Sequence, residues 1–387
     1  MAEWLKTSLI DIVELIGGGT PKTSKAEYWG GNINWLSVKD FNNENRYVYS
    51  TEKTITEEGL NNSSTKLLRK DDIIISARGT VGELAMIPFP MAFNQSCYGI
   101  RAKDGIDSTF LYYLIKHSVR KLKAMTHGSV FDTITRDTFA NIEVSIPDIE
   151  TQQRVAKMLA DIDDKVENNQ RINNNLEQQA KALYKDWFFD FSPFSTEGNL
   201  PNGWRLGTVG DIIQLHDSKR VPLSGSERDK MEKIYPYYGA TSLMDYVDNY
   251  LFDGIYLLLG EDGTVVDSLG FPILQYVYGQ FWVNNHAHII TGKEGFSVEE
   301  LYLFFSLTNI KSIVTGAVQQ KVSQQNLKKV PAIIPSKEAL SAFDDLIQPI
   351  FAQIRNLRDE NAHLADLRDT LLPKLMSGEI DVSDIEF

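Results

Sequence analysis

The sequence predicts an α+β fold in which two mixed α/β globular blocks are joined by two long helices that form an antiparallel coiled coil. The pattern "NIEVSIP" from Asn141, followed by a long helical segment, returns as "KVPAIIP" from Lys329. Apolar residues in both long segments alternate at spacings of four and three, as they do in coiled coils. The large blocks that precede them differ from each other. These observations predict an internal repeat with pseudo-two-fold symmetry.

Two sequence shifts define the repeat. A shift of 188 residues places Pro147 on Pro335, and a shift of 200 residues places Trp4 on Trp204. From these anchors we expect five segments: a first block over residues 1–148, a first long spacer helix over 149–192, a second block over 193–335, a second long spacer helix over 336–378 and a C-terminal tail over 379–387.

Each long segment carries a seam of mostly apolar residues. The seam of the first is Val155, Leu159, Ile162, Val166, Asn169, Asn173, Leu176, Ala180, Leu183 and Trp187; that of the second is Phe343, Ile347, Ile350, Ile354, Leu357, Asn361, Leu364, Arg368, Leu371 and Leu375. At about 1.5 Å per residue, each helix would be on the order of 55 Å long. The first helix leads into the second block and the second helix leaves it, so packing them together predicts an antiparallel spacer.

Two asparagines occupy equivalent seam positions near the middle of the helices. A polar residue in such a seam lowers stability but disfavours other registers. Because the middles of antiparallel helices meet, we expect Asn173 to face Asn361 and to set the register. Two independently hydrated asparagines are the alternative.

Both blocks mix strand and helix patterns. Strands are expected at "INWLSV" from Ile33, "DIIISA" from Asp72, "SCYGIRA" from Ser96 and "NIEVSIP" from Asn141. The segment "STFLYYLIKHSVRKLKAM" from Ser108 predicts a helix, with "SVEELYLFFSLTNIKSIV" from Ser297 as its counterpart. A further short match between the blocks is "GTV", which begins at Gly79 and again at Gly263.

The composition is that of an ordinary globular protein. The chain has 387 residues, of which 42% are apolar, and a net charge of −13. The last 50 residues hold 4 Lys and Arg against 11 Asp and Glu, so more than half of the net charge lies on the second helix and tail. We expect a cytoplasmic protein without a membrane segment, because the apolar runs are short, no secretory signal is evident and Cys97 has no partner for a disulfide.

The motifs that enzymes of nucleic-acid chemistry need are absent, and we expect no catalytic residue, no cofactor and no metal. The sequence has no (N/D)PP(Y/F) motif, no Gly-rich cofactor motif after a strand and no GxxxxGK[ST] loop. An Asp-x-Lys pattern from Asp163 is expected on the polar face of the first helix, and another begins at Asp217; we attribute both to chance. His286 and His288 align with Ser96 and Tyr98, which indicates a variable surface rather than a zinc site.

Several segments resemble the specificity (S) subunits of type I restriction–modification systems, the HsdS family. They are "GGGTPKTSKAEYWGGNINWLSVKDF" from Gly17, "KDWFFDFSPF" from Lys185, "YPYYGAT" from Tyr235, "YLFDGIYLLLGEDGT" from Tyr250 and "LLPKLMSGEI" from Leu371. The resemblance covers essentially the whole chain. It implies that the blocks are target recognition domains that bind double-stranded DNA. It also implies that the helices bind two adenine methyltransferase (M) subunits, with restriction-translocase (R) subunits in the full complex.

The repeat itself agrees with a non-catalytic DNA-reading subunit. Two different heads on a pseudo-symmetric spacer would read an asymmetric, bipartite DNA target with inverted half-sites, and each head would position one methyltransferase. The alternative is a coiled-coil assembly scaffold whose heads bind proteins, which the net charge of −13 favours slightly.

Candidate DNA contacts are polar residues of turns and loops. In the first block they are Thr20, Lys22, Thr23, Lys25, Lys39, Arg78, Asn94 and Gln95; in the second they are Ser218, Lys219, Arg220, Tyr238, Asn284, Asn285, Gln319, Gln320 and Lys321. Arg and Lys suit guanine, Asn and Gln suit adenine, and the others would hold phosphates. For any single residue, an ordinary hydrated loop position is an equal alternative.

Two further surfaces are candidates. Lys116, Arg120, Lys121 and Lys123 form a basic helix face that would suit phosphates or solvent equally. The aromatic residues between Trp187 and Phe194 are expected mainly to close a small core at the helix end, with one or two members left for a partner.

Overall fold

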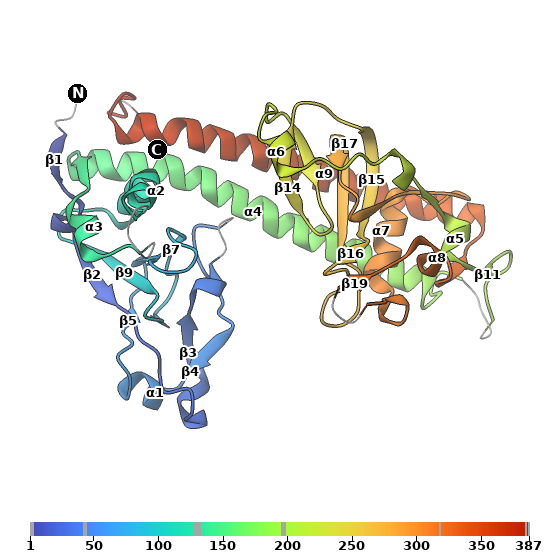
Figure 1. Ribbon diagram of the computed structural model, residues 1–387, viewed down its shortest axis with the longest axis horizontal. Helices are drawn as coiled ribbons and strands as arrows, with labels where there is room; N and C mark the ends of the chain where they lie inside the picture. The colour runs from blue at the N-terminus through green and yellow to red at the C-terminus, as the bar shows by residue number, and fades with distance from the viewer. Residues whose placement is uncertain are drawn as a thin grey trace. The chain divides into compact units, whose positions relative to one another are not determined.

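The computed structural model describes residues 4–41, 45–126, 133–194, 199–316, 319–383 and 385 (Figure 1). The chain divides into two compact units, of which unit 1 is Met1–Arg171 with Arg358–Phe387 and unit 2 is Ile172–Leu357. We call the part of unit 1 that precedes residue 149 head 1, and the part of unit 2 between residues 199 and 336 head 2. Within the described ranges, no helix has the length and apolar character needed to cross a membrane.

Head 1 contains three small sheets, with the strand orders β1-β10, β2-β9-β6-β7 and β4-β3-β8-β5. Its strands are β1 (Leu5–Ser8), β2 (Val13–Gly17), β3 (Trp29–Leu36), β4 (Lys53–Ile55), β5 (Leu67–Leu68), β6 (Ile73–Ser76), β7 (Leu84–Met86), β8 (Met91–Phe93), β9 (Cys97–Ala102) and β10 (Glu143–Ile146). Its helices are α1 (Glu57–Asn61), α2 (Ser108–Thr126) and α3 (Arg136–Ala140). All four strands and the helix expected in this block are present.

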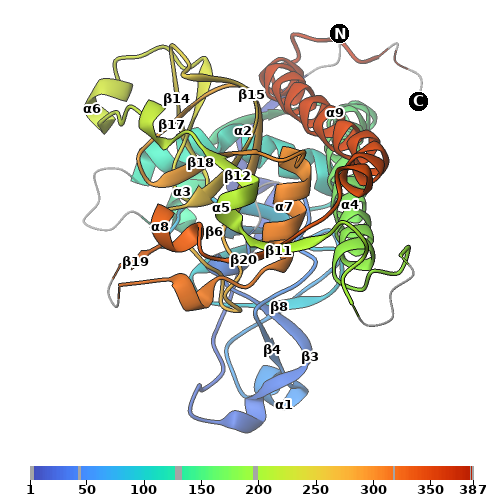
Figure 2. The same ribbon diagram turned by 90° about the vertical axis from the view of Figure 1, so that its right-hand side faces the viewer.

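Head 2 contains a sheet of order β12-β18-β15-β17-β13-β14 and two strand pairs, β11-β20 and β16-β19. Its strands are β11 (Arg205–Thr208), β12 (Ile213–Leu215), β13 (Tyr235–Tyr238), β14 (Leu243–Val247), β15 (Phe252–Gly260), β16 (Asp262–Gly263), β17 (Leu274–Val283), β18 (Ala287–Gly292), β19 (Gln320–Lys321) and β20 (Pro331–Ile334). Its helices are α5 (Val209–Ile212), α6 (Gly225–Arg228), α7 (Val298–Leu307) and α8 (Gln324–Leu327). Helix α7 contacts β15, β17 and β18 (Figure 2).

The strand registers confirm the internal repeat. Leu5 pairs with Ile146 in head 1, and Arg205 pairs with Ile334 in head 2, which are the same positions after shifts of 200 and 188 residues. The heads differ where β7 and β8 of head 1 correspond to the single strand β17 of head 2. Pro88 lies between β7 and β8, and since proline has no N–H to donate, it interrupts the ladder there.

Helix α7 is shorter than the expected counterpart of α2. It ends at Leu307, and Thr308 is extended, with φ −106° and ψ 115°. The Thr308 hydroxyl donates to the carbonyl of Phe304, and the Asn309 amide donates to the carbonyl of Leu269. These side-chain bonds compete with continuation of the helix.

The two long helices are α4 (Ile149–Phe188) and α9 (Lys337–Met376). In unit 1 they lie side by side and antiparallel, because Asp163 pairs with Arg368 whereas Lys165 pairs with Glu360. In unit 2 the rings of Tyr184 and Phe343 meet at 5.5 Å. Within each unit, halves of both helices contribute to the main hydrophobic core.

The buried seam residues include Asn169, whose side-chain amide donates to Asn361 Oδ1 at 2.9 Å. Asn361 in turn donates to the carbonyl of Val166 at 3.3 Å. The partner of Asn361 in unit 1 is therefore one turn earlier in α4 than the expected Asn173. With Asn169 opposite Asn361, all ten seam positions of α4 lie opposite seam positions of α9, whereas the expected pairing of Asn173 with Asn361 would align only five of them.

Candidate nucleic-acid interface

Three turns of head 1 have structural equivalents in head 2. After β6 and β15, the amide of Ala77 donates to the carbonyl of Ser96 at 2.8 Å, and the amide of Glu261 donates to the carbonyl of His286 at 2.8 Å. The strand pairs that lead into these turns match as well, since Ser76 faces Cys97 and Gly260 faces Ala287. The two heads therefore present different side chains on one backbone arrangement.

The turns after β8 and β17 are also alike. Asn94 Oδ1 accepts the amide of Ser96 at 3.0 Å, and Asn284 Oδ1 accepts the amide of His286 at 2.8 Å. The turns after β3 and β13 lie beside them, because the amide of Asn94 donates to Leu36 and that of Asn284 donates to Tyr238. Both asparagines hold their turns with Oδ1, and the side-chain amide of Asn284 also donates to Met244 Sδ at 3.3 Å.

A hollow of about 490 Å³ in head 1 gathers three of the predicted contacts. Lys39, Arg78 and Asn94 line it from the turns that follow β3, β6 and β8. Lys53 and Glu52 also line it, so that cationic groups outnumber acidic ones in this part of an acidic chain. Neither Lys39 nor Arg78 has an ion-pair partner in the part of the chain that the structure describes. Their charges are free to meet an anionic or acceptor-rich ligand.

The other predicted contacts of head 1 lie outside this lining. Thr20 donates its hydroxyl to Gln95, which orders both side chains. Lys25 bonds the hydroxyl of Tyr28 at 3.1 Å, and this bond raises the pKa of Lys25. Lys22 and Thr23 are exposed in the loop before β3.

In head 2, Arg220 is held inside the protein. Its guanidinium donates to Glu261 Oε2 at 2.7 Å and to the carbonyls of Ala287 and Asn285 at 2.8 and 3.3 Å. With these donors occupied, Arg220 positions the turns instead of contacting a ligand directly. Asn284 is likewise buried, with 4% of its surface exposed.

The remaining predicted residues of head 2 differ in exposure. Those that are exposed are Ser218, Lys219, Asn285, Gln319 and Lys321; Tyr238 and Gln320 are half-buried. Strand β19 pairs Lys321 with Asp262, which brings the Gln320–Lys321 segment beside the turn that follows β15. Gln320 and Lys321 of this group therefore lie beside the turn that follows β15.

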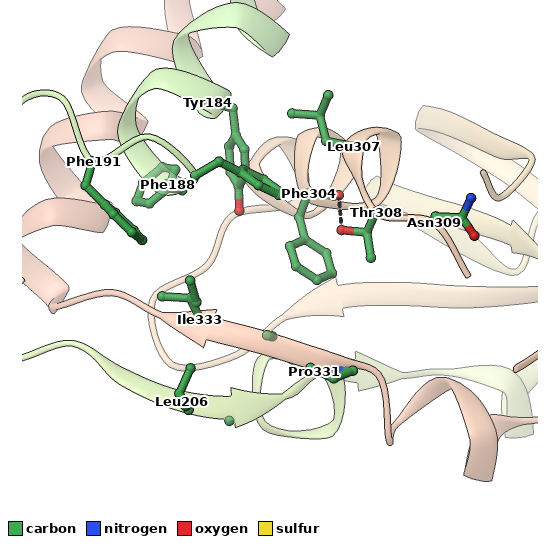
Figure 3. Close-up of a pocket in the computed structure, with 13 residues that line it drawn as sticks. Tyr184, Phe188, Phe191, Leu206, Phe304, Leu307, Thr308, Asn309, Pro331 and Ile333 are labelled. Atoms are coloured by element: carbon green, nitrogen blue, oxygen red, sulfur yellow. Dashed lines mark hydrogen bonds between the residues drawn. The ribbon is translucent and has the colours of Figure 1, made fainter. Parts of the chain in front are cut away.

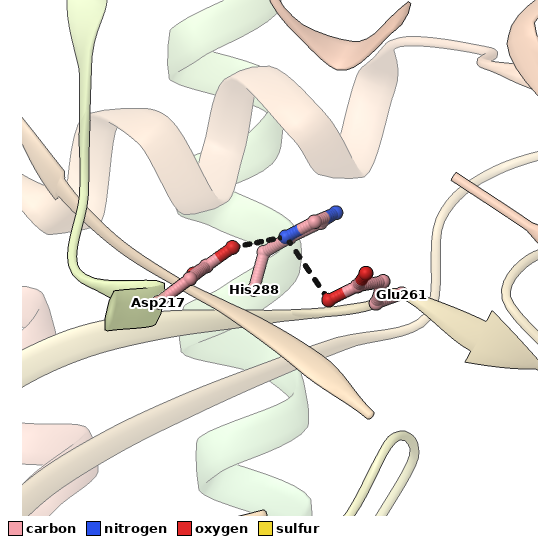
Figure 4. A group of neighbouring side chains, drawn as sticks. All are labelled: Asp217, Glu261 and His288. Atoms are coloured by element: carbon pink, nitrogen blue, oxygen red, sulfur yellow. Dashed lines mark hydrogen bonds and ion pairs between the residues drawn. The ribbon is translucent and has the colours of Figure 1, made fainter. Parts of the chain in front are cut away.

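A charged cluster of the buried Asp217 and His288 and the half-buried Glu261 connects the turn after β15 with β18 and with the segment after β12 (Figure 4). His288 Nδ1 donates to Asp217 Oδ2 at 2.6 Å, and Nε2 donates to the carbonyl of Val322 at 2.8 Å. Burial acts to raise the pKa of Asp217, but the hydrogen bonds from His288 and from the Ile289 amide outweigh it and lower that pKa. Both ring nitrogens are therefore occupied as donors.

The spacing of this cluster would suit a metal ion, but its hydrogen bonds do not. A histidine that binds a metal needs a free lone pair on one ring nitrogen, and His288 uses both nitrogens to donate. The guanidinium of Arg220 already places a cation beside Glu261. We therefore assign no metal to the cluster and interpret it as a structural support of the turns.

A family described as "Type I restriction modification DNA specificity domain" matches residues 1–178 and 201–362. The chain belongs to this family. It is 29% identical to the type I restriction enzyme MjaIX specificity subunit of Methanocaldococcus jannaschii, over 99% of this chain and 95% of that protein. It is 23% identical to the EcoprrI specificity subunit of Escherichia coli, over 90% of this chain and 89% of that protein.

The fold agrees with that of a solved family member. The S subunit of the type I restriction–modification system from M. genitalium superimposes with a TM-score of 0.58 at 17% identity, over 97% of this chain and 96% of that chain. The two matched ranges of the specificity-domain family correspond to the two halves of the internal repeat.

Each specificity domain carries these turns on strands of its main sheets, and Asp262, a charged residue of one such turn, was not singled out in the sequence. Asp262 is half-buried and its carboxylate pairs with His286 Nδ1 at 2.6 Å. The "GTV" match between residues 79–81 and 263–265 was the available signal, because it places Asp262 opposite Arg78.

The second specificity domain also has an apolar hollow of about 540 Å³, whose lining contains none of the predicted contacts (Figure 3). It is lined by the end of α4, including Phe188, by Phe304 of α7 and by Leu206 of β11. Phe188 is buried, as expected for a core that closes the helix end, whereas Phe189 is 44% exposed and Leu206 is 75% exposed. The aromatic segment thus provides mainly core, together with an exposed apolar rim.

Proposed function

We propose that this chain is the non-catalytic DNA specificity subunit of a type I restriction–modification complex. Its two heads read an asymmetric, bipartite target in double-stranded DNA and position adenine methyltransferase subunits on it. Membership of the DNA specificity family, through a match to both halves of the chain, supports this assignment. Within the structure, the supporting observation is the pair of equivalent turns after β6 and β15. Their backbone hydrogen bonds are the same, but head 1 has Arg78 where head 2 has Asp262.

The proposed partners are double-stranded DNA, two adenine methyltransferase (M) subunits and restriction-translocase (R) subunits. The cationic hollow of head 1 supplies donors for base edges and phosphates. The last 50 residues hold 4 Lys and Arg against 11 Asp and Glu, and the exposed residues of α9 include Asp359, Asp366 and Asp369 beside Leu367. An acidic surface of this kind suits a protein partner and not DNA. We place the complex in the cytoplasm.

The decisive test is a genome-wide map of N6-methyladenine. Cells that express this chain with the adenine methyltransferase of the same system are compared with cells that express the methyltransferase alone. We expect a new motif in two different parts with a fixed gap and one methylated adenine on each strand. A contiguous motif, or methylation that does not depend on this chain, would support the assembly scaffold instead.

The isolated chain is expected to bind its target duplex weakly and with strong salt dependence. Its net charge of −13 opposes association with phosphates, and a partner must supply much of the neutralisation. Fluorescence anisotropy with target and scrambled duplexes, at low and physiological salt, measures this with and without the methyltransferase. Tight binding by the chain alone that is indifferent to salt would contradict the expectation.

A further inference from the structure

The turn that follows β6 in head 1 and β15 in head 2 places one side chain of each head at an equivalent position. Arg78 and Asp262 both stand two residues after their strand, and each is followed by a glycine with positive φ, 81° at Gly79 and 92° at Gly263. The preceding amides make the same bond across to the neighbouring strand, at 2.8 Å in both heads. The two side chains thus leave equivalent points of equivalent turns.

The chemistry at this position is opposite in the two heads. Arg78 is exposed and lines the hollow, and its guanidinium offers five N–H donors and no acceptor. Asp262 offers only acceptors, and one of its oxygens lies 2.6 Å from His286 Nδ1. His286 itself stands where head 1 has Ser96, since the carbonyls of both accept the equivalent amide bond.

A position that carries a carboxylate in one head is unsuited to a phosphate contact. Two anions repel, so a carboxylate near the DNA is stable only where it meets donors, and the amino groups of bases are the donors of the major groove. An arginine at the same position can donate two hydrogen bonds to guanine, which presents the acceptors O6 and N7 in the major groove.

We propose that this turn position determines the base specificity of each head, an inference that rests on the proposed function. Arg78 reads a guanine in the half-site of head 1. Asp262 reads an exocyclic amino group in the half-site of head 2, either N4 of cytosine or N6 of adenine. His286 is the positioning residue, because its bond to one carboxylate oxygen leaves the other oxygen for the base.

The test is a methylation map of variants within the intact complex. Arg78→Asp is expected to replace guanine by cytosine or adenine at one position of the first half-site and to leave the second half-site unchanged. Asp262→Asn is expected to reduce discrimination at one position of the second half-site only, by about tenfold or more. Arg69→Asp makes the same substitution at an exposed arginine outside the hollow and serves as the matched control.

The outcomes separate this inference from the proposed function. A bipartite motif with the unchanged chain, together with an unaltered motif in both Arg78→Asp and Asp262→Asn, overturns the inference alone. Absence of a bipartite motif with the unchanged chain overturns the proposed function. If Arg78→Asp abolishes methylation, Arg78→Lys decides: a relaxed guanine preference at one position supports base reading, and an unaltered motif overturns it.

Discussion

Replacing Asp163 by alanine is expected to destabilise unit 1 by about 1–3 kcal/mol, because the buried Tyr113 hydroxyl would lose its acceptor and the partly buried Arg368 would keep only the exposed Asp369 as a carboxylate partner. Asp163 is 8% exposed, and its two oxygens accept from Arg368 at 2.8 Å and from the hydroxyl of Tyr113 at 2.7 Å. These partners lie on α9 and α2, so one carboxylate of α4 joins three helices. Burial raises the pKa of Tyr113, so the phenol keeps the proton that it donates.

Asp161→Ala is the matched control for this prediction. Asp161 lies two residues earlier on α4 and pairs with Lys157 at 2.8 Å, with both side chains about half exposed. Exposed pairs at this helical spacing contribute only about 0.3–0.5 kcal/mol. Urea denaturation of the full chain gives the free energy of unfolding of each variant. Native-state hydrogen exchange of the α2 amides, measured separately, shows whether the loss lies at this contact. Equal losses in the two variants would show that the Asp163 pair contributes no more than a surface pair.

The repeat and its strand pairing could be predicted because the same local sequence patterns occur twice in the chain. The shifts of 188 and 200 residues locate the strands whose registers now match, Leu5 with Ile146 and Arg205 with Ile334. A third shift, visible only in the "GTV" match, locates the turn that carries Arg78 and Asp262. Short matches between divergent blocks therefore mark places where the backbone is kept while side chains change.

Burial of charged residues could not be predicted in the same way. Asp163 was expected on the polar face of the first helix, which is wrong, because α2 of head 1 packs on that face and supplies Tyr113 as a partner. Arg220 was expected to be free in a loop, yet Glu261 and two carbonyl groups occupy its donors. In both cases the partner is remote in sequence. The charge pattern of the helix or loop that carries the residue therefore does not show that the residue is buried.

Glu300→Gln is expected to stabilise unit 2 at neutral and alkaline pH. Burial raises the pKa of Glu300 to about 8, although the hydrogen bond from the Ser297 amide acts to lower it. One carboxyl oxygen of Glu300 has no hydrogen-bond partner among the described residues. Between the unfolded value of 4.5 and about 8, the unfolded chain ionises while the folded chain keeps the proton. Stability that is present below pH 4.5 is therefore lost as the pH rises to about 8, by an amount on the order of 2–4 kcal/mol.

Glutamine reproduces the neutral carboxyl, so Glu300→Gln should remove this loss, and its advantage over the unchanged chain should grow between pH 5 and pH 8. Glu227 provides the matched control, since it occupies the same capping position after Ser224 but is exposed. The Ser224 side-chain and backbone bonds lower the pKa of Glu227, so its contribution is lost only as the pH falls. Thermal unfolding of both variants across this pH range measures the difference. A loss of stability in Glu300→Gln that is equal at every pH would show that Glu300 is a partnered, ionised group.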